Sequence, residues 1–281
     1  MSREPDLAAG HPPFTVLRAA HIEFLVTDLE RARAFYVDLL GFVETERDGD
    51  RLYLRGYEER DHHGLVLRRA PAAGVGHLAF RVASEHDLDL LERLYRTHGL
   101  PTRWARGEAG QGRALRVQDP AGLPVEFVYE IAQAEWLLQR FDRYRGAFVM
   151  RLDHFNCQVP DVAAASRWYR QELGFACSEY ITDGADASSG LWGVWLHRKQ
   201  TVHDIALMNG VGPRVHHAGF WVQDPASVLR ACDLMAAAHL ADRIERGPGR
   251  HGLANAFFVY LRDPDNNRIE LYTNDYLIAD P

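Results

Sequence analysis

The sequence contains one pattern twice, and this internal repeat restricts the fold more than any other feature. Residues 21–42 and 154–175 align without a gap, and each copy runs twenty residues from an initial His to a Gly that precedes a Phe. Between these two points, both copies contain an alternation of apolar residues, then an Asp, then apolar residues at helical spacing. Such self-similarity indicates that one structural unit occurs twice in the fold.

Each copy is expected to begin as a strand and to continue as a helix. Apolar residues at every second position after the His predict the strand. Asp28 and Asp161 follow, where a carboxylate can accept hydrogen bonds from the free N–H groups of a helix N-terminus. Gly41 and Gly174 then end the two helices, because a left-handed conformation costs Gly little.

A second, weaker similarity follows within each half of the chain. Residues 76–82 resemble residues 216–222, and both stretches are short predicted strands. Residues 119–127 resemble residues 263–271, where an Asp-Pro turn leads into a strand that carries a Glu. Further helices are expected at residues 85–97, at residues 225–238 and, between the two halves, at residues 133–145.

These patterns define the expected architecture. Each half consists of a strand, a helix and further strands, and this unit occurs twice within the half, so we predict an α+β fold with two tandem domains. A chain of 281 residues is long enough to form two separate cores. We place the first domain at residues 1–147 and the second at residues 148–281.

Composition excludes several classes of function. The net charge of −7 and the even spread of arginines leave no basic patch, so we expect no nucleic acid as a partner. The apolar runs are much shorter than the roughly 20 residues of a membrane span, and residues 1–13 lack the apolar core of a signal peptide. The three cysteines form no CxxC pair. We therefore expect reduced thiols and a cytoplasmic protein without a membrane partner.

Two histidines and one glutamate fall at corresponding positions of the repeated strands. His154, His217 and Glu270 are far apart in the chain, so only the fold can bring them together. Two neutral imidazoles and one carboxylate, with coordination positions left open, are the ligand set of non-haem Fe(II) oxygenases. The open positions leave room for a catechol that binds through both oxygens and for O2. A single carboxylate also leaves the site with a net positive charge, which favours a deprotonated catechol oxygen.

The first half carries the same residue types. His21, His77 and Glu126 occupy the equivalent positions, so the triad alone does not decide which half binds a metal, and a second, weak metal site stays open there. The neighbouring residues differ between the halves, and the polar groups of the second half favour the chemistry there. The second half has Asn156 and Tyr260 where the first has Glu23 and Arg116, whereas His203 aligns with His63.

Five stretches of the second half carry a resemblance to a known family. They are RLDHFN (151–156), HRKQTVHDIAL (197–207), RVHHAGF (214–220), DRIERGPGRHG (242–252) and NAFFVYLRDPDNNRIELYTNDY (255–276). With these stretches the chain resembles the type I extradiol ring-cleaving dioxygenases of the vicinal oxygen chelate superfamily, over nearly its whole length. The resemblance implies two βαβββ modules in each domain. It also implies cleavage of a catechol by O2, with 3,4-dihydroxyphenylacetate and 5-carboxymethyl-2-hydroxymuconate semialdehyde as the expected substrate and product.

The resemblance further implies roles for individual residues. His154, His217 and Glu270 match the metal ligands of the family. His203 matches the histidine that moves a catechol proton and directs O2, a task that suits a group which titrates near neutral pH. Tyr260 matches a hydrogen-bond donor to the metal-bound substrate oxygen, His251 a residue that supports this tyrosine, and Asn156, Trp195 and Arg246 match positions of the substrate pocket.

The expected cofactor is Fe(II) or Mn(II), one per subunit, because this ligand set accepts either metal. O2 is the expected co-substrate, and the resemblance suggests a homotetramer. Relatives of this type often carry a longer C-terminal extension that closes over the site, whereas this chain ends at Pro281. Recognition of the substrate carboxylate is therefore expected to depend on Trp195, Arg246 or a neighbouring subunit.

Other functions stay open at this point. A different catechol is compatible with the same residues. A metal-dependent isomerase or lyase of the glyoxalase type is a second possibility, although that chemistry calls for more carboxylate in the site. A sequestering protein of the same superfamily is a third, although a binding module has no need of a metal triad.

Overall fold

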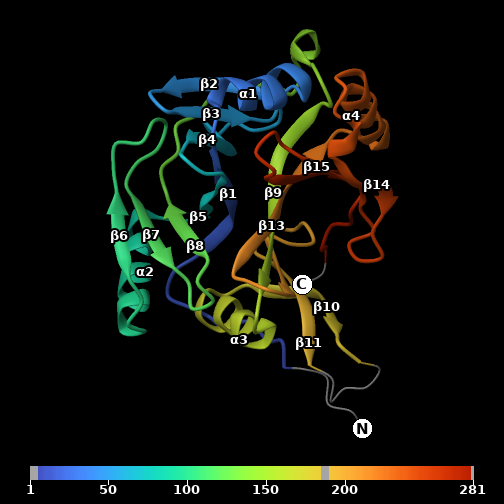
Figure 1. Cartoon of the computed structure of the whole chain (residues 1–281). Coiled ribbons are helices and arrows are strands. Elements are labelled where there is room, and N and C mark those ends of the chain that lie inside the picture. Colours follow the sequence, from blue (N-terminus) through green and yellow to red (C-terminus); the bar gives the residue numbers. More distant parts are fainter. Residues whose placement is uncertain (1–5, 185–189, 280–281) are drawn as a thin grey trace.

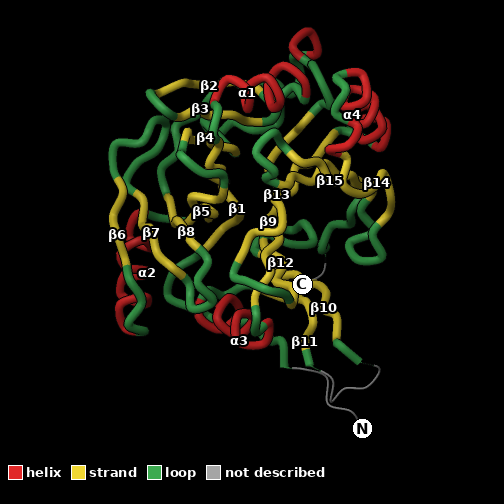
Figure 2. Tube along the Cα trace, viewed as in Figure 1, coloured by secondary structure: helices red, strands yellow, loops and turns green. Residues whose placement is uncertain are grey.

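The computed structural model describes residues 6–184 and 190–279, which form two eight-stranded sheets (Figure 1). The first sheet uses strands from the first half of the chain, on the left of Figure 1, and the second sheet uses strands from the second half. This arrangement confirms the predicted duplication and the α+β fold class. Helices are few and short, and they lie on the outside of the sheets (Figure 2).

The two sheets have the same topology. The strands of the first are β1 (Val16–Val26), β2 (Val43–Asp48), β3 (Arg51–Arg55), β4 (Leu65–Arg69), β5 (Gly74–Val82), β6 (Thr102–Ala105), β7 (Ala114–Gln118) and β8 (Pro124–Val128). Those of the second are β9 (Val149–Val159), β10 (Ala176–Thr182), β11 (Leu191–His197), β12 (Ile205–Asn209), β13 (Arg214–Val222), β14 (Ile244–Arg250), β15 (Phe257–Arg262) and β16 (Arg268–Thr273). The order is β2-β3-β4-β1-β5-β8-β7-β6 in one and β10-β11-β12-β9-β13-β16-β15-β14 in the other. Each strand of the first sheet therefore has a counterpart at the same place in the second sheet, and the two are eight strands apart in the chain.

Helices occur in both modules of each half, and the ends of α2 and α4 match the sequence prediction to within one residue. Helices α2 (Glu85–Thr97) and α4 (Pro225–Ala237) confirm the two predicted for the second modules. In the first modules, helix α1 (Leu29–Arg33) continues as a π-helix η1 (Ala34–Leu39), and α3 (Val162–Arg167) continues as η3 (Trp168–Glu172). A short 3-10 turn, η4 (Ala241–Arg243), follows α4. Within the described ranges, none of the helices is long and apolar enough to cross a membrane.

The predicted caps are also confirmed. The carboxylate of Asp28 accepts a hydrogen bond from the N–H of Arg31, and that of Asp161 accepts one from the N–H of Ala164. Gly41 and Gly174 have φ angles of 85° and 74°, in the left-handed region that favours glycine.

The helix predicted at residues 133–145 is wrong. This segment is an irregular connection with one 3-10 turn, η2 (Phe141–Arg143). Its expected apolar face does not pack as a unit, because Trp136 is 50% exposed and Phe141 is 72% exposed. The backbone instead pairs with the first half, where Gln133 forms a bridge with Asp61. Tertiary pairing thus outweighs helical periodicity here.

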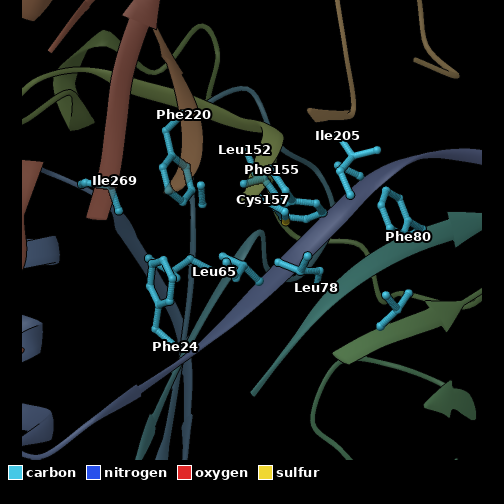
Figure 3. Packing of buried hydrophobic residues seen from close by; sticks show 14 of the residues in the cluster. Phe24, Leu65, Leu78, Phe80, Leu152, Phe155, Cys157, Ile205, Phe220 and Ile269 are labelled. Atoms are coloured by element: carbon cyan, nitrogen blue, oxygen red, sulfur yellow. The ribbon is translucent and has the colours of Figure 1, made fainter. Parts of the chain in front are cut away.

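One apolar core joins the two halves (Figure 3). The ring of Phe80 in β5 packs edge-on against Phe155 in β9, with 5.6 Å between the ring centroids. Two buried hydrogen bonds cross the junction in a reciprocal way. The hydroxyl of Tyr36 donates to Asp263 at 3.0 Å, and the hydroxyl of Tyr169, its counterpart, donates to Asp119 at 3.0 Å. The main apolar core is therefore shared by the two halves, in place of the two separate cores expected from the chain length, and smaller clusters lie within each half.

Candidate metal centre

The register of three neighbouring strands brings the predicted triad of the second half together. His154 lies on β9, His217 on β13 and Glu270 on β16, and all three side chains are buried. Nε2 of His154 is 3.3 Å from Nε2 of His217 and 3.1 Å from Oε2 of Glu270, and Nε2 of His217 is 3.2 Å from the same Oε2.

These separations fit a divalent metal. Donor atoms at adjacent corners of an octahedron with a radius of about 2.1 Å lie about 3.0 Å apart. The three donor atoms are nearly equidistant, as one triangular face of an octahedron requires, and the opposite face stays free for exchangeable ligands. Together with the two-histidine, one-carboxylate donor set, this geometry fits Fe(II) or Mn(II).

A glycine makes room for the ring of His154. Gly219 on β13 lies opposite His154 on β9 and opposite Glu270 on β16. A Cβ at position 219 would lie 2.7 Å from Nδ1 of His154 and closer still to Cε1 and Nε2. The ring of the ligand therefore occupies the space that any other residue at position 219 would fill.

A buried aspartate orients this ligand, and sequence reasoning missed it. Oδ2 of Asp153 lies 3.2 Å from Nδ1 of His154, which leaves Nε2 to face the other two donors. Lys199 and Thr201 hold this carboxylate, at 3.5 Å and 3.3 Å from Oδ1. A carboxylate on the second nitrogen fixes the tautomer and the ring orientation of a metal-binding histidine. The signal in the sequence was the comparison of the copies, because Ala20 stands in the equivalent position.

Two further predicted residues lie next to the triad. The ring of His203 is tilted against that of His154, with 3.9 Å between the centroids. Asn156 follows His154 by two positions on β9 and is paired with His217 in the sheet register, so it shares the face of both ligands. Nδ1 of His203 and Oδ1 of Asn156 are buried and have no hydrogen-bond partner among the described residues. Buried polar atoms are normally paired, so both atoms are available as partners for a bound ligand.

His251 and Tyr260 form a chain that ends at the glutamate. Nε2 of His251 is 2.8 Å from Oε1 of Glu270, and the hydroxyl of Tyr260 is 3.3 Å from the same Nε2. The ring of His251 stacks on Phe258, at 3.6 Å between centroids and 8° between planes. Tyr260 also lies directly opposite Glu270 in the pairing of β15 with β16.

Trp195 and Arg246 lie farther out on the same sheet face. Trp195 on β11 pairs with Ala206, which in turn pairs with Asn156, so the row continues to the triad. Arg246 on β14 pairs with Tyr260 and is exposed. In the described part of the chain, no hydrogen bond or ion pair links either residue to the three ligands. Both residues therefore lie on outer strands of the sheet face that carries the triad, without such a link to the three ligands.

The histidines of the site differ in the direction in which their surroundings shift the pKa. Burial lowers the pKa of His217 to about 4 and that of His203 well below its ordinary value. Burial acts in the same direction on His154, but hydrogen bonds to Asp153 and Glu270 outweigh it and raise its pKa to about 9. The pKa of Glu270 stays well below its ordinary value in spite of burial, because His217 and His154 stabilise its charge. A metal that binds here displaces the proton of His154.

The fold also brings the triad of the first half together. Nε2 of His21 is 3.0 Å from Nε2 of His77 and 3.4 Å from Oε1 of Glu126, and Nε2 of His77 is 3.7 Å from Oε2. Ligand geometry alone therefore does not distinguish the halves. The residues around each triad do, since Nε of Arg116 lies 2.6 Å from Oε2 of Glu126 where the second half has Tyr260.

Comparison with known proteins agrees with this geometry. A family model for the Glyoxalase/Bleomycin resistance protein/Dioxygenase superfamily matches residues 18–127 and 151–271, one match in each half. Among curated proteins, the chain is 32% identical to the metapyrocatechase of Geobacillus stearothermophilus, over 96% of this chain and 85% of that protein. It is 30% identical to the manganese-dependent 2,3-dihydroxybiphenyl 1,2-dioxygenase of Geobacillus genomosp. 3, over 95% of this chain and 88% of that protein.

Solved structures are similar over the whole chain. The homoprotocatechuate 2,3-dioxygenase of Arthrobacter globiformis superimposes with a TM-score of 0.91 at 45% identity, and the match covers 100% of this chain and 85% of that one. The Brevibacterium fuscum enzyme, in an anaerobic complex with 3,4-dihydroxyphenylacetate, gives 0.91 at 44% identity, with 100% and 86% covered. The duplicated fold, the ligand triad and these matches show that the chain belongs to the extradiol dioxygenases of the Glyoxalase/Bleomycin resistance protein/Dioxygenase superfamily.

Proposed function

We propose that this protein cleaves the ring of 3,4-dihydroxyphenylacetate with O2 and yields 5-carboxymethyl-2-hydroxymuconate semialdehyde, both atoms of O2 entering the product. His154, His217 and Glu270 hold one Fe(II) or Mn(II) per subunit. The observation that carries this proposal is the triangle of three buried donor atoms, 3.1 to 3.3 Å apart, on one face of the second sheet. The substrate assignment is supported by the similarity to the two homoprotocatechuate dioxygenases.

The residues beside the triad account for the proton transfers. A metal held by His154, His217 and Glu270 would supply a path for electron density between the catechol and O2. The imidazole of His203 takes a proton from a catechol hydroxyl and returns it when the O–O bond breaks. Its ring contacts His154, so it lies close enough to the triad for both steps. The hydroxyl of Tyr260 donates a hydrogen bond to a substrate oxygen, and His251 orients it from 3.3 Å.

The outer residues of the sheet face bind the rest of the substrate. Asn156 presents its unpaired Oδ1 near the ligands, and buried Trp195 forms an apolar wall two strands away. Arg246 is the cation of this group, and its place opposite Tyr260 suits it to the carboxylate of the substrate side chain. Plain catechol lacks that carboxylate, so the two substrates separate this role from ring binding.

We place the catalytic site in the domain formed by residues 148–281 and regard residues 1–147 as a non-catalytic domain, because the first triad is paired with Arg116. A homotetramer in the cytoplasm completes the proposal. Three free cysteines support the cytoplasmic location. Analytical ultracentrifugation measures the number of subunits directly.

The test begins with anaerobic purification and metal analysis. The protein, loaded with Fe(II) or Mn(II), is then mixed with 3,4-dihydroxyphenylacetate, catechol or 2,3-dihydroxybiphenyl and air. We expect a yellow ring-opened product, one O2 consumed per substrate, and the highest kcat/KM for 3,4-dihydroxyphenylacetate. Equal values for catechol would overturn the substrate assignment, and no product from any catechol at full metal occupancy would overturn the activity.

A matched pair of variants tests which half is catalytic. Glu270→Gln should remove metal and activity, because it deletes the only carboxylate ligand of the second triad. Glu126→Gln makes the same change in the first triad and should leave metal content and activity nearly intact. The reverse result would assign the chemistry to residues 1–147.

A further inference from the structure

The first triad lies beside a network of charges, of which Glu126 and Glu23 are buried and the others are partly exposed. Arg116 contacts Glu126 at 2.6 Å and Glu108 at 2.7 Å. Glu23, whose side chain is 3% exposed, contacts Arg68 at 3.0 Å and Arg51 at 3.5 Å. Three carboxylates and three guanidinium groups thus form one network beside His21 and His77, and Arg51 also contacts half-exposed Asp50 at 3.4 Å.

Three of the corresponding positions in the second half are neutral. Sheet register fixes the correspondence, since Glu23 pairs with His77 as Asn156 pairs with His217. In the same way, Arg116 pairs with Glu126 as Tyr260 pairs with Glu270. Arg68 corresponds to Met208, and the contact of Arg68 with Glu23 is replaced by one from Nδ2 of Asn156 to Sδ of Met208 at 3.2 Å.

The two glutamates consequently have different partners. Glu126 is fully buried and has a permanent cation beside it in Arg116. The ion-pair partners of Glu270 are all histidines, namely His154, His217 and His251, and no lysine or arginine lies within 4.0 Å of it in the described part of the chain. A buried carboxylate requires a compensating charge. Arg116 supplies it in the first triad, whereas the second triad depends on protons or on a metal.

A divalent ion at the first triad would add two positive charges to a network in which the carboxylates are already paired with guanidinium groups. Only the carboxylate of Glu126 would separate the ion from the guanidinium of Arg116, and the two positive charges would repel each other. His21, His77 and Glu126 nevertheless keep their donor atoms within reach of a common ion, all within 4.8 Å of one another. The ligands are thus present in the first half, and the charge beside them differs from that in the second half.

We propose that Arg116 takes the place of a metal ion in the first triad, and that its charge confines metal binding to His154, His217 and Glu270. The first triad is then a latent metal site that removal of this one charge opens. This inference rests on the proposed function only for the assignment of the metal to the second triad.

Metal stoichiometry tests the proposal without any measurement of activity. Full-length protein is dialysed anaerobically against Mn(II), and bound manganese is counted by mass spectrometry and by the loss of the EPR signal of free Mn(II). The wild type should bind one equivalent. Arg116→Tyr, which introduces the residue type of the second half, and Arg116→Met, which keeps the bulk without the charge, should each bind two. Arg116→Lys keeps the charge and should stay at one.

Second-site variants locate the additional ion. His77→Ala in the Arg116→Met background should return the count to one, and His217→Ala in that background should also leave one, now in the first triad. Circular dichroism and thermal melts identify any variant that fails to fold. If either Arg116→Tyr or Arg116→Met fails to fold, the other one carries the test. Two equivalents in the wild type, or one in both folded neutral variants, would overturn the role of Arg116. A wild type without metal would count against the proposed function, and the gain or absence of one equivalent in Arg116→Met would still decide the inference.

Discussion

Gly219→Ala is the smallest change that should disable the proposed metal site. The added Cβ would lie 2.7 Å from Nδ1 of His154, whereas an ordinary contact begins at 3.4 Å. The ring therefore has to move by at least about 0.7 Å, and by more at Cε1 and Nε2, which lie closer. The backbone of β13 cannot yield easily, because position 219 is paired on one side with His154 and on the other with Glu270.

The expected loss of affinity follows from this displacement. Metal–ligand distances tolerate a deviation of about 0.2 Å, so a shift of about 0.7 Å takes Nε2 of His154 out of coordination range. Loss of a partner that merely orients a ligand weakens metal binding by about 10- to 100-fold. Displacement of a ligand itself should cost at least about 100-fold, which corresponds to about 2.8 kcal/mol.

Anaerobic titration with Mn(II), followed by calorimetry, measures the Kd of Gly219→Ala against that of the wild type. The first half offers a matched control, because its triad already accommodates a Cβ at the same position: Ala79 lies opposite His21 and Glu126, and the donor atoms of His21, His77 and Glu126 still lie within 4.8 Å of one another. Ala79→Gly should leave the Kd unchanged. The melting temperature without metal shows that Gly219→Ala is folded. A folded Gly219→Ala protein with a Kd within threefold of the wild-type value would refute the argument.

Three further predictions concern residues outside the triad. Asp153→Asn should weaken Mn(II) binding by about 10- to 100-fold, because it removes the carboxylate that orients His154, and equilibrium dialysis measures the change; an unchanged Kd would contradict this role. Burial raises the pKa of Glu59 to about 7 from 4.5, so its stabilising contribution is full below pH 4.5 and is lost as the pH rises through 7. Urea unfolding at several pH values measures this loss. Between pH 4.5 and 7 the free energy of unfolding of the wild type should fall by up to about 3 kcal/mol relative to that of Glu59→Gln, and parallel plots of this free energy against pH for the two proteins would count against the raised pKa. Tyr169→Phe should lower the free energy of unfolding by about 1–3 kcal/mol, since it removes the hydroxyl that donates to Oδ2 of buried Asp119 and leaves that carboxylate with backbone donors such as the N–H of Leu123, and a loss below about 0.5 kcal/mol would disagree.

Local sequence patterns were reliable where local physics decides the structure. The caps at Asp28 and Asp161 and the glycines at 41 and 174 depend on hydrogen bonds and φ angles within one turn, and the structure has them where the pattern places them. The connection at residues 133–145 has helical periodicity but begins with a strand-like bridge, since Gln133 pairs with Asp61, 72 residues earlier. Periodicity contains no information about such a distant partner.

The sequence by itself determined the duplication, the fold class and the residue types of the candidate site. It did so because repeats, alternation and caps are properties of neighbouring residues, and because the triad recurs in both copies. Only the tertiary structure decided what surrounds each triad. It showed that Arg116 neutralises Glu126, that Asp153 orients His154, and that Gly219 leaves space for a ring. These relations join adjacent strands, so they depend on register and on side-chain volume, which take effect only once the sheets have formed.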